Sequence, residues 1–374
     1  MRQDYLTGNI ITPAGNIPLV STRLTFSDRL GAIRVRWLIR RNNYRVDPGL
    51  YGTGSPDNQS DVFVTANYKL SFDHLRKNLD GMSAWILVLD TKGVNVWCAA
   101  GKGTFGTREL VNRIHSTNLK KIISHNRIIV PQLGATGVSA YKVKELTAGE
   151  HKKENLAGKP SGFDFSTAGQ KLLIDRGFDV IFGPVRAADI RSFLQNKYRT
   201  TDEMRKVHFT FTDRLKLVPV DLVYARYRLL IAFAVILIIS VLGAKDFIFQ
   251  HFIERGVPSI IRITLAYIAG IVITPLLLPY IPVKMFAFKG LISGIFLCII
   301  LLASHGSGTH TMEVVSWFFL IAAVSSFMAM NFTGASTFTS LSGVKKEMRV
   351  FVPIQITLAA AGLILLTINN LFLN

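Results

Sequence analysis

The first two hundred residues alternate between short apolar runs and segments whose apolar positions have helical spacing. Short apolar runs bounded by turn residues are typical of buried strands, and apolar residues three or four apart indicate amphipathic helices. The predicted strands are 61–65, 84–90, 127–130 and 178–182, and the predicted helices are 70–79, 107–114, 138–146 and 187–196. Strands that alternate with helices predict an α/β domain with a mostly parallel, Rossmann-like sheet.

Long apolar runs dominate the remainder of the chain. Each is close to the ~20 residues that a helix needs to cross a bilayer. The candidate spans are 226–243, 260–281, 285–303, 313–332 and 350–373. A charged segment precedes them, which indicates a linker. The predicted organisation is a soluble domain at 1–200, a linker at 201–225 and a transmembrane domain of about five helices at 226–374.

Positive charge predicts the orientation and one partner. Lys and Arg collect in cytoplasmic loops. The regions after the second and fourth spans hold Lys284, Lys289, Lys345, Lys346 and Arg349, and 304–312 holds no Lys or Arg, although the other expected outer loop, 244–259, carries Lys245 and Arg255. We therefore expect a multi-pass protein of a bacterial or archaeal inner membrane, with a cytoplasmic N-terminal domain and no N-terminal signal peptide. The formal net charge of +19 favours contact with membrane lipid. Nucleic acid is not an expected partner, because no recognised nucleic-acid motif occurs.

The chain has two cysteines, Cys98 and Cys298. Cys298 lies inside an apolar run, so the two are not expected to pair in a disulfide. No CxxC occurs, and the chain therefore cannot ligate an iron–sulfur cluster with four cysteines by itself. A low-potential electron, if the chemistry needs one, must come from a partner.

Cys98 is the residue that most directly suggests chemistry. It lies in the segment NVWCAAGK, residues 95–102, directly after a predicted buried strand. Gly93, Gly101 and Gly103 permit close backbone approach, and Trp97 provides an apolar wall. A buried structural thiol is the commoner fate of such a residue. A nucleophile, a redox thiol and a metal ligand all remain open at this point, whereas the spacing of Gly101-Lys102-Gly103-Thr104 does not match a phosphate loop.

Polar and small residues follow the predicted strands at several places. Ligands of parallel α/β sheets bind at the carboxyl ends of the strands. The segments that fall at such ends are 65–67, 91–102, 132–137 and 183–186. We expect them to converge on one site.

Four sequence motifs in the N-terminal domain together resemble a known family. They are TANYKL at 65–70, WILVLDTKG at 85–93, NVWCAAGK at 95–102 and GPVRAAD at 183–189. The set is similar to the cobamide-binding domain in the large subunit of the corrinoid iron–sulfur protein of the acetyl-CoA pathway. With about five spans after it, the chain resembles the corrinoid protein of the bacterial mercury-methylation pair.

The resemblance implies a cofactor, a reaction and partners. It implies a cobamide whose cobalt takes Cys98 as its lower axial ligand, and a thiolate is a soft ligand suited to such a metal. Co(I) would accept a methyl group from methyl-tetrahydrofolate or a methylated corrinoid protein and transfer it to Hg(II), forming methylmercury. The reductant would be a ferredoxin-like partner with two 4Fe–4S clusters, and this chain would carry none. The implied corrin contacts are Thr65, Asn67, Gly93, Asn95, Val96, Trp97, Cys98, Ala99, Ala100, Gly101, Lys102, Gly134, Thr136, Gly183 and Val185.

Two alternatives stay open at the level of sequence. One is a corrinoid methyl carrier of the acetyl-CoA pathway, although the membrane segments and Cys98 count against it. The other is a membrane transporter or a cobamide sensor without turnover. The spans contain few charges, with Arg262 near one end and Glu313 at an edge, whereas ion-coupled transporters usually carry more.

Overall fold

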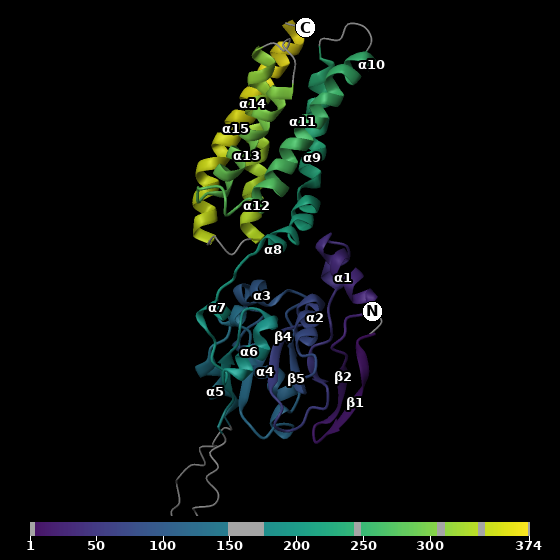
Figure 1. Ribbon diagram of the computed structural model, residues 1–374, viewed down its shortest axis with the longest axis vertical. Coiled ribbons are helices and arrows are strands. Elements are labelled where there is room, and N and C mark those ends of the chain that lie inside the picture. The colour runs from purple at the N-terminus through teal and green to yellow at the C-terminus, as the bar shows by residue number, and fades with distance from the viewer. Residues whose placement is uncertain (1–3, 149–175, 243–247, 305–310, 336–340, 373–374) are drawn as a thin grey trace, which may run out of the picture. The chain divides into compact units, whose positions relative to one another are not determined.

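A mixed sheet of seven strands forms the centre of the N-terminal unit in this computed structural model, which describes residues 4–148, 176–242, 248–304, 311–335 and 341–372 (Figure 1). The spatial order is β1-β2-β3-β5-β4-β6-β7. Neighbours among β5, β4, β6 and β7 pair in parallel. The strands are β1 Leu6–Thr12, β2 Gly15–Val20, β3 Gly49–Thr53, β4 Val62–Ala66, β5 Ala84–Leu89, β6 Arg127–Val130 and β7 Asp179–Phe182.

The expected mostly parallel sheet is confirmed, because four of the six neighbouring strand pairs in the described residues are parallel, including β2 with β3. β3 runs antiparallel to β5, and β1 pairs with β2 as an antiparallel hairpin. The hairpin was not predicted, because most of its side chains are exposed and it lacks a continuous apolar run. The α/β class of the domain is confirmed.

Alternating side chains of β5 pack on opposite faces of the sheet. Trp85, Leu87 and Leu89 join a core with α3, α4 and α5, while Ile86 and Val88 join a second core with α2 and α6. Both faces of the strand are therefore buried, which explains its uninterrupted apolar sequence. The helices of this unit are α1 Phe26–Arg36, α2 Lys69–Asn78, α3 Val96–Lys102, α4 Thr107–Ser116, α5 Ala140–Thr147, α6 Ile190–Gln195 and α7 Asp202–Arg205, with 3₁₀ turns at Arg41–Asn43, Leu119–Lys121, Gln132–Gly134 and Ala187–Asp189.

A buried group of four charges holds α1 against α2. Lys69 Nζ lies 2.5 Å from Asp28 and 2.7 Å from Asp73, and Arg76 contacts the same two carboxylates at 2.7 and 2.8 Å. Each of these side chains is at most 6% exposed. The two cations and two anions compensate one another, which makes their burial tolerable.

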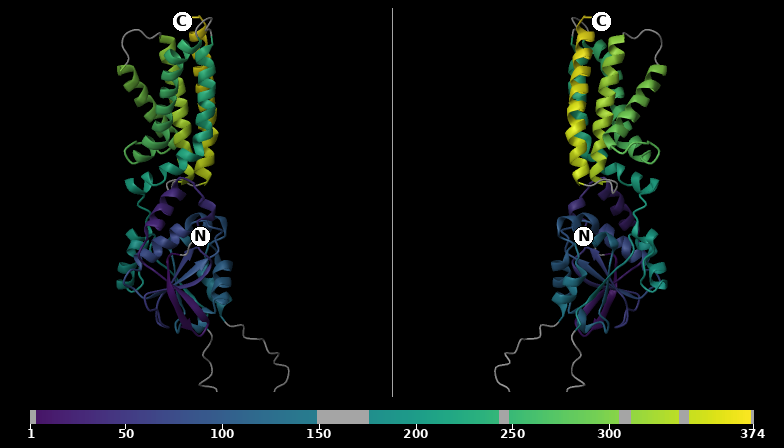
Figure 2. Two further views of the ribbon diagram at one scale, coloured as in Figure 1. Left: turned by 90° about the vertical axis from the view of Figure 1, so that its right-hand side faces the viewer. Right: turned by 90° about the vertical axis from the view of Figure 1, so that its left-hand side faces the viewer.

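The chain divides into two compact units, Met1–Val35 with Ile39–Val207, and Arg36–Leu38 with His208–Asn374. Among the described residues of the second unit, five helices are long and apolar enough to cross a membrane, as expected (Figure 2). The first begins earlier than the sequence indicated, because α8 and α9 already occupy the expected linker. The elements are α8 Phe211–Leu215, α9 Val218–Val241, α10 Ile248–His251, α11 Val257–Ile268, α12 Thr274–Leu276, α13 Phe286–Ser304, α14 Thr311–Asn331 and α15 Leu341–Phe372, with π-helical turns at Phe252–Gly256 and Ala269–Ile273 and a 3₁₀ turn at Phe332–Ala335.

α14 is the central helix of the second unit, and it packs against α11, α13 and α15. Small residues permit this close approach. A Cβ added to Gly290 would lie 2.5 Å from Ala329 Cβ, and one added to Gly362 would lie 2.8 Å from Leu320 Cγ. Such small-residue contacts are typical of helices that associate within membranes.

Candidate functional site

Asn67 fixes the loop that follows β5. It stands just after β4, is 2% exposed, and its Oδ1 accepts the backbone N–H groups of Thr91 (3.1 Å) and Gly93 (2.9 Å). Its Nδ2 donates to Asp90 Oδ1 at 3.2 Å. Lys92 and Gly93 adopt positive φ of 58° and 75°, so the chain turns sharply here. The side chain of Asn67 therefore positions the loop and does not face solvent.

The segment NVWCAAGK forms the short helix α3 with well-defined ends. Asn95 is its N-cap, and Asn95 Oδ1 accepts the backbone N–H of Cys98 at 2.9 Å. Gly103 ends the helix with φ of 80°, a conformation that favours glycine. The seven residues Val96–Lys102 make about two turns of helix, and the Asn95 cap stabilises the beginning of this helix.

The two sides of α3 differ in exposure. On one side, Val96, Ala99 and Ala100 are buried. They belong to the core that packs between the sheet and the helices α4 and α5. Trp97 is 38% exposed, Cys98 is half-buried, and Gly101 and Lys102 are exposed. A Cβ added to Gly101 would meet no atom within 4 Å, so open space lies above this turn. The outer side of α3 thus presents the Cys98 thiol, which forms no disulfide. The Trp97 indole stands beside it, and Gly101, which has no side chain, follows one turn later.

The loop after β6, residues 134–137, packs against the buried side of α3 and against Phe105. A Cβ on Gly137 would overlap the carbonyl oxygen of Phe105 and lie 3.1 Å from Ala100 Cα, and one on Gly134 would lie 2.5 Å from the Phe105 ring. Gly134 therefore serves close packing, while Thr136 beside it is exposed. Gly137 and Phe105 were not among the expected site residues. The second glycine in Gly134-Ala135-Thr136-Gly137 is the signal that could have identified Gly137, whereas the sequence carries no comparable signal for Phe105.

The remaining expected residues lie farther along the sheet or inside it. Thr65 is buried within β4. Gly183 follows β7, which β6 separates from β4, and it donates its N–H to Val130 O at 2.8 Å. Val185 donates to Met204 O at 2.8 Å. Asn67, Gly93, α3 and the 134–137 loop thus come together, while Gly183 and Val185 stand at the same edge two strands away.

Asp90 is the carboxylate at the start of the loop between β5 and α3. Burial alone would raise the pKa of its carboxyl, but hydrogen bonds from Lys92 and the lysine's positive charge lower the pKa overall. The Lys92 ammonium lies 2.6 Å from the carboxylate. Glu109 accepts the Asp90 N–H at 2.9 Å and pairs with Arg113 at 2.7 Å. These contacts pair Asp90 with Lys92 and Glu109 with Arg113, and none of them involves Cys98.

Part of the N-terminal unit is similar in sequence to known proteins. Residues 39–156, from before β3 to beyond α5, match the model of the CO dehydrogenase/acetyl-CoA synthase delta subunit family. The matched part contains Asn67, α3 and the 134–137 loop.

Individual relatives point the same way. The gamma subunit of the acetyl-CoA decarbonylase/synthase complex of Methanocaldococcus jannaschii is 34% identical over 98 residues, which are 26% of this chain and 20% of that protein. The gamma 2 subunit from Methanosarcina thermophila is 32% identical over 99 residues, 25% of this chain and 21% of that protein. The chain thus matches about a fifth of the length of these relatives. It contains a domain related to theirs, followed by five long apolar helices.

Proposed function

We propose that the N-terminal unit binds a cobamide and that Cys98 is the lower axial ligand of its cobalt. The observation that carries the proposal is the setting of Cys98: a free thiol on the outer side of α3, at the carboxyl end of β5. The carboxyl edge of parallel strands is where ligands of such sheets bind. The sequence resemblance and the match over residues 39–156 support the same interpretation.

The residues present fit such a cofactor. A flat macrocycle needs an apolar surface free of protruding side chains, and Gly101 leaves that space while Trp97 offers an apolar wall. The Asn95 side chain is directed to the backbone of Cys98 and does not block access. A thiolate is the metal-binding form of cysteine and a soft donor.

The chain's own residues would position this donor. Asn95 caps the turn that carries Cys98, Asn67 fixes the preceding loop, and Gly137 lets the next loop press against Ala100. When bound, a cobamide supplies a cobalt centre that accepts a methyl group and passes it on. An anionic sulfur ligand donates electron density to the metal, which favours transfer to an electrophile such as Hg(II).

We infer that the whole protein is a membrane-bound methyltransferase subunit that forms methylmercury. Its methyl donor would be methyl-tetrahydrofolate or a methylated corrinoid protein. The reductant and carrier of Hg(II) would be a ferredoxin-like partner with two 4Fe–4S clusters, since the sequence has only two cysteines. The N-terminal unit would lie in the cytoplasm, anchored to the inner membrane by the five helices.

The direct test is a methylation assay with the full chain. Purified protein reconstituted with hydroxocobalamin is supplied, without oxygen, with methyl-tetrahydrofolate, Hg(II) and the ferredoxin-like partner, which an excess of a chemical reductant keeps reduced so that it can return Co(III) to Co(I). Cys98→Ala should lose at least 99% of methylmercury formation while the protein stays folded, about 3 kcal/mol of lost stabilisation of the transition state. Ser116→Ala, which removes an exposed hydroxyl from α4, is the matched control and should retain full activity. Wild-type rates in Cys98→Ala would refute the role of the thiol.

The names of the relatives favour a second candidate, a methyl carrier for acetyl-CoA synthesis. The same preparation distinguishes the two. A protein that binds cobalamin and takes up methyl groups, yet gives no methylmercury, would be such a carrier. A protein that binds cobalamin but takes up no methyl group would favour a cobamide sensor, and a protein that retains no cobalamin would favour a transporter.

A further inference from the structure

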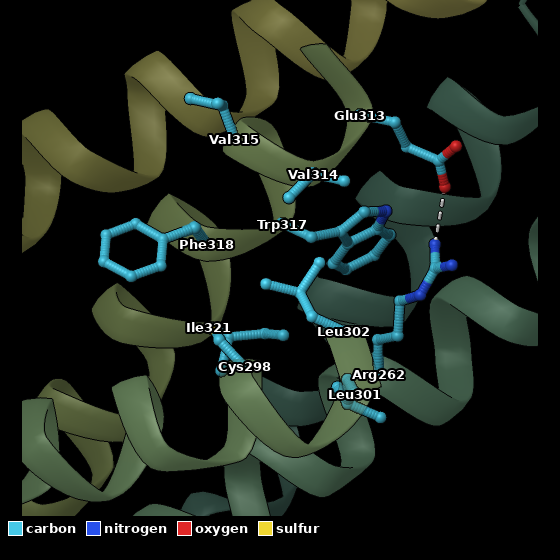
Figure 3. Close-up of a pocket in the computed structure, with 10 residues that line it drawn as sticks. All are labelled: Arg262, Cys298, Leu301, Leu302, Glu313, Val314, Val315, Trp317, Phe318 and Ile321. Carbon is cyan, nitrogen blue, oxygen red and sulfur yellow. Dashed lines mark hydrogen bonds and ion pairs between the residues drawn. The ribbon is translucent and has the colours of Figure 1, made fainter. Parts of the chain in front are cut away.

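A cavity of about 260 Å³ lies between three helices of the second unit (Figure 3). Its walls come from α11, α13 and α14 and are almost entirely carbon. Leu301, Leu302, Val314, Phe318 and Ile321 supply most of this surface. The volume lies between the ~150 Å³ of a cavity that holds benzene and the ~300 Å³ at which sites for drug-sized ligands begin.

Two charged side chains, Arg262 and Glu313, stand at one side of this carbon-lined cavity, which we call its polar side. Arg262 Nη1 lies 2.8 Å from Glu313 Oε1, and the Arg262 guanidinium stands 5.0 Å from the centre of the Trp317 ring. Figure 3 shows this ion pair on one side of Trp317 and Phe318 on the other. Because the two charges neutralise each other, the polar side does not demand a charged ligand. An amphiphile with a neutral polar group and an apolar tail fits this arrangement.

Trp317 has an unused hydrogen-bond donor at this cavity. The residue is 5% exposed, and its indole Nε1 is buried without a partner. A buried N–H without an acceptor costs about 1–3 kcal/mol, so native proteins rarely leave one. Figure 3 places the nitrogen on the side of the ring that faces Glu313. Protein atoms cover the nitrogen in this structure, so a ligand oxygen at the polar side of the cavity would satisfy it once the indole turns toward the cavity.

The cavity opens sideways near the ends of the helices. Leu302 is 46%, Val315 38% and Phe318 37% exposed, so the cavity walls reach the outer surface of the bundle. Leu302 lies in the last turn of α13 and Glu313 in the first turn of α14. Since these helices are long enough to span a bilayer, this is the depth at which lipid ester groups meet the acyl chains and at which Trp is enriched.

We propose that this cavity binds one acyl chain of a bilayer phospholipid, and that the Trp317 ring turns so that its N–H donates to the ester oxygen of the lipid. The apolar walls hold the chain, and the lipid enters through the opening at Phe318. An apolar cavity left empty forfeits dispersion contacts along its lining, and lipid is the solvent available at this depth. The site is independent of the cobamide proposal, because every wall residue belongs to the second unit.

Native mass spectrometry tests the proposal. The full-length protein is assembled in nanodiscs of palmitoyl-oleoyl-phosphatidylcholine, extracted into mild detergent and weighed with its retained lipid. Wild type should carry one tightly held phosphatidylcholine. Val314→Trp fills the cavity and should lose it, while Val235→Trp, the same exchange on an exposed position of α9, should keep it. An unchanged lipid count in Val314→Trp, or a wild type without bound lipid, would overturn the proposal.

A second variant examines the hydrogen bond separately from the volume. Trp317→Phe keeps an aromatic ring but removes the N–H, and it should lower the lipid-bound fraction on the order of two- to tenfold. If Trp317→Phe retains lipid as wild type does, the ester contact is wrong. If wild type retains detergent alone in preference to phosphatidylcholine, the cavity is a site for small apolar molecules and the lipid assignment is refuted.

Discussion

Cys98 owes its setting to residues that contact only other parts of the chain. Asn67 and Asn95 use their side-chain oxygens on backbone N–H groups, and Gly137 packs against Ala100. The resemblance implies that Asn67 and Asn95 contact the corrin, and in the structure their side-chain oxygens also accept backbone N–H groups that position Gly93 and Cys98. This positioning could not be predicted, because the partners of Asn67 lie on a different strand end whose approach is set by tertiary packing.

Two glycines near α3 should respond oppositely to the same substitution. Gly101→Ala adds a methyl group to open space on a helix, so α3 should become more stable by up to about 1 kcal/mol while cobalamin binding weakens. Gly137→Ala should displace the loop from α3 and destabilise it by about 1–3 kcal/mol, because the Cβ would overlap Phe105. Hydrogen exchange of the α3 amides and cobalamin titration report the two effects.

The pair also serves as an internal control. If Gly101→Ala binds cobalamin as tightly as wild type, the space above Gly101 is not used by the cofactor. If Gly137→Ala leaves exchange in α3 unchanged, the loop does not support the helix.

At the level of elements, the strands with continuous apolar sequences were predicted well. The ranges expected at 84–90, 127–130 and 178–182 correspond to β5, β6 and β7. Burial on both faces gives such strands a strong local signal. The β1–β2 hairpin lies at the edge of the sheet and has mostly exposed side chains, so its sequence carries little of that signal.

The buried charges between α1 and α2 could not be foreseen from sequence. Asp28 meets Lys69 and Arg76, which are far away along the chain, and only the docking of α1 brings them together. Burial would raise the pKa of Asp28, but hydrogen bonds from Lys69 and the Thr25 backbone, with the charges of Lys69 and Arg76, hold it at about 2.

This cluster predicts a loss of stability in acid. The folded pKa of Asp28 lies below its unfolded value of about 3.9, so its contribution is fully present above pH 4 and is lost as the pH falls toward 2. The free energy of unfolding should fall by about 2 kcal/mol between pH 4 and pH 2 through this group alone. Asp28→Asn should be less stable by about 3–5 kcal/mol at pH 7, because two buried cations then face one anion.

Urea unfolding of the N-terminal unit, read by cleavage with pepsin, measures this dependence. The difference in free energy of unfolding between wild type and Asp28→Asn should become smaller as the pH falls from 4 to 2. A difference that stays constant over this range would contradict the pKa assigned to Asp28.

At the scale of the whole molecule, hydropathy predicted the five long helices because a bilayer demands length and apolar composition above all else. Their packing was not predictable, since it depends on which small residues meet. Gly290 against Ala329 and Gly362 against Leu320 illustrate contacts between segments separated in sequence. The cavity beside Trp317 likewise arises only when α11, α13 and α14 assemble.

Five membrane-crossing helices, the number of candidates among the described residues, would place Ser116 and Asn374 on opposite sides of the membrane. In a Cys98→Ala, Cys298→Ala background, Asn374→Cys should react with an impermeant maleimide in intact cells. Ser116→Cys in the N-terminal unit should react only after lysis. Labelling of both positions from the same side would contradict the five-span arrangement, and the reversed pattern would contradict a cytoplasmic N-terminal unit.

The central claim is that Cys98 binds the cobalt of a cobamide. The most direct measurement is the visible absorption spectrum of the full-length protein reconstituted with cobalamin, recorded for wild type and Cys98→Ala side by side. We predict that the wild type retains the corrin and that its absorption bands shift when the thiol is removed. Identical spectra in the two proteins, or no retained corrin in either, would contradict the assignment.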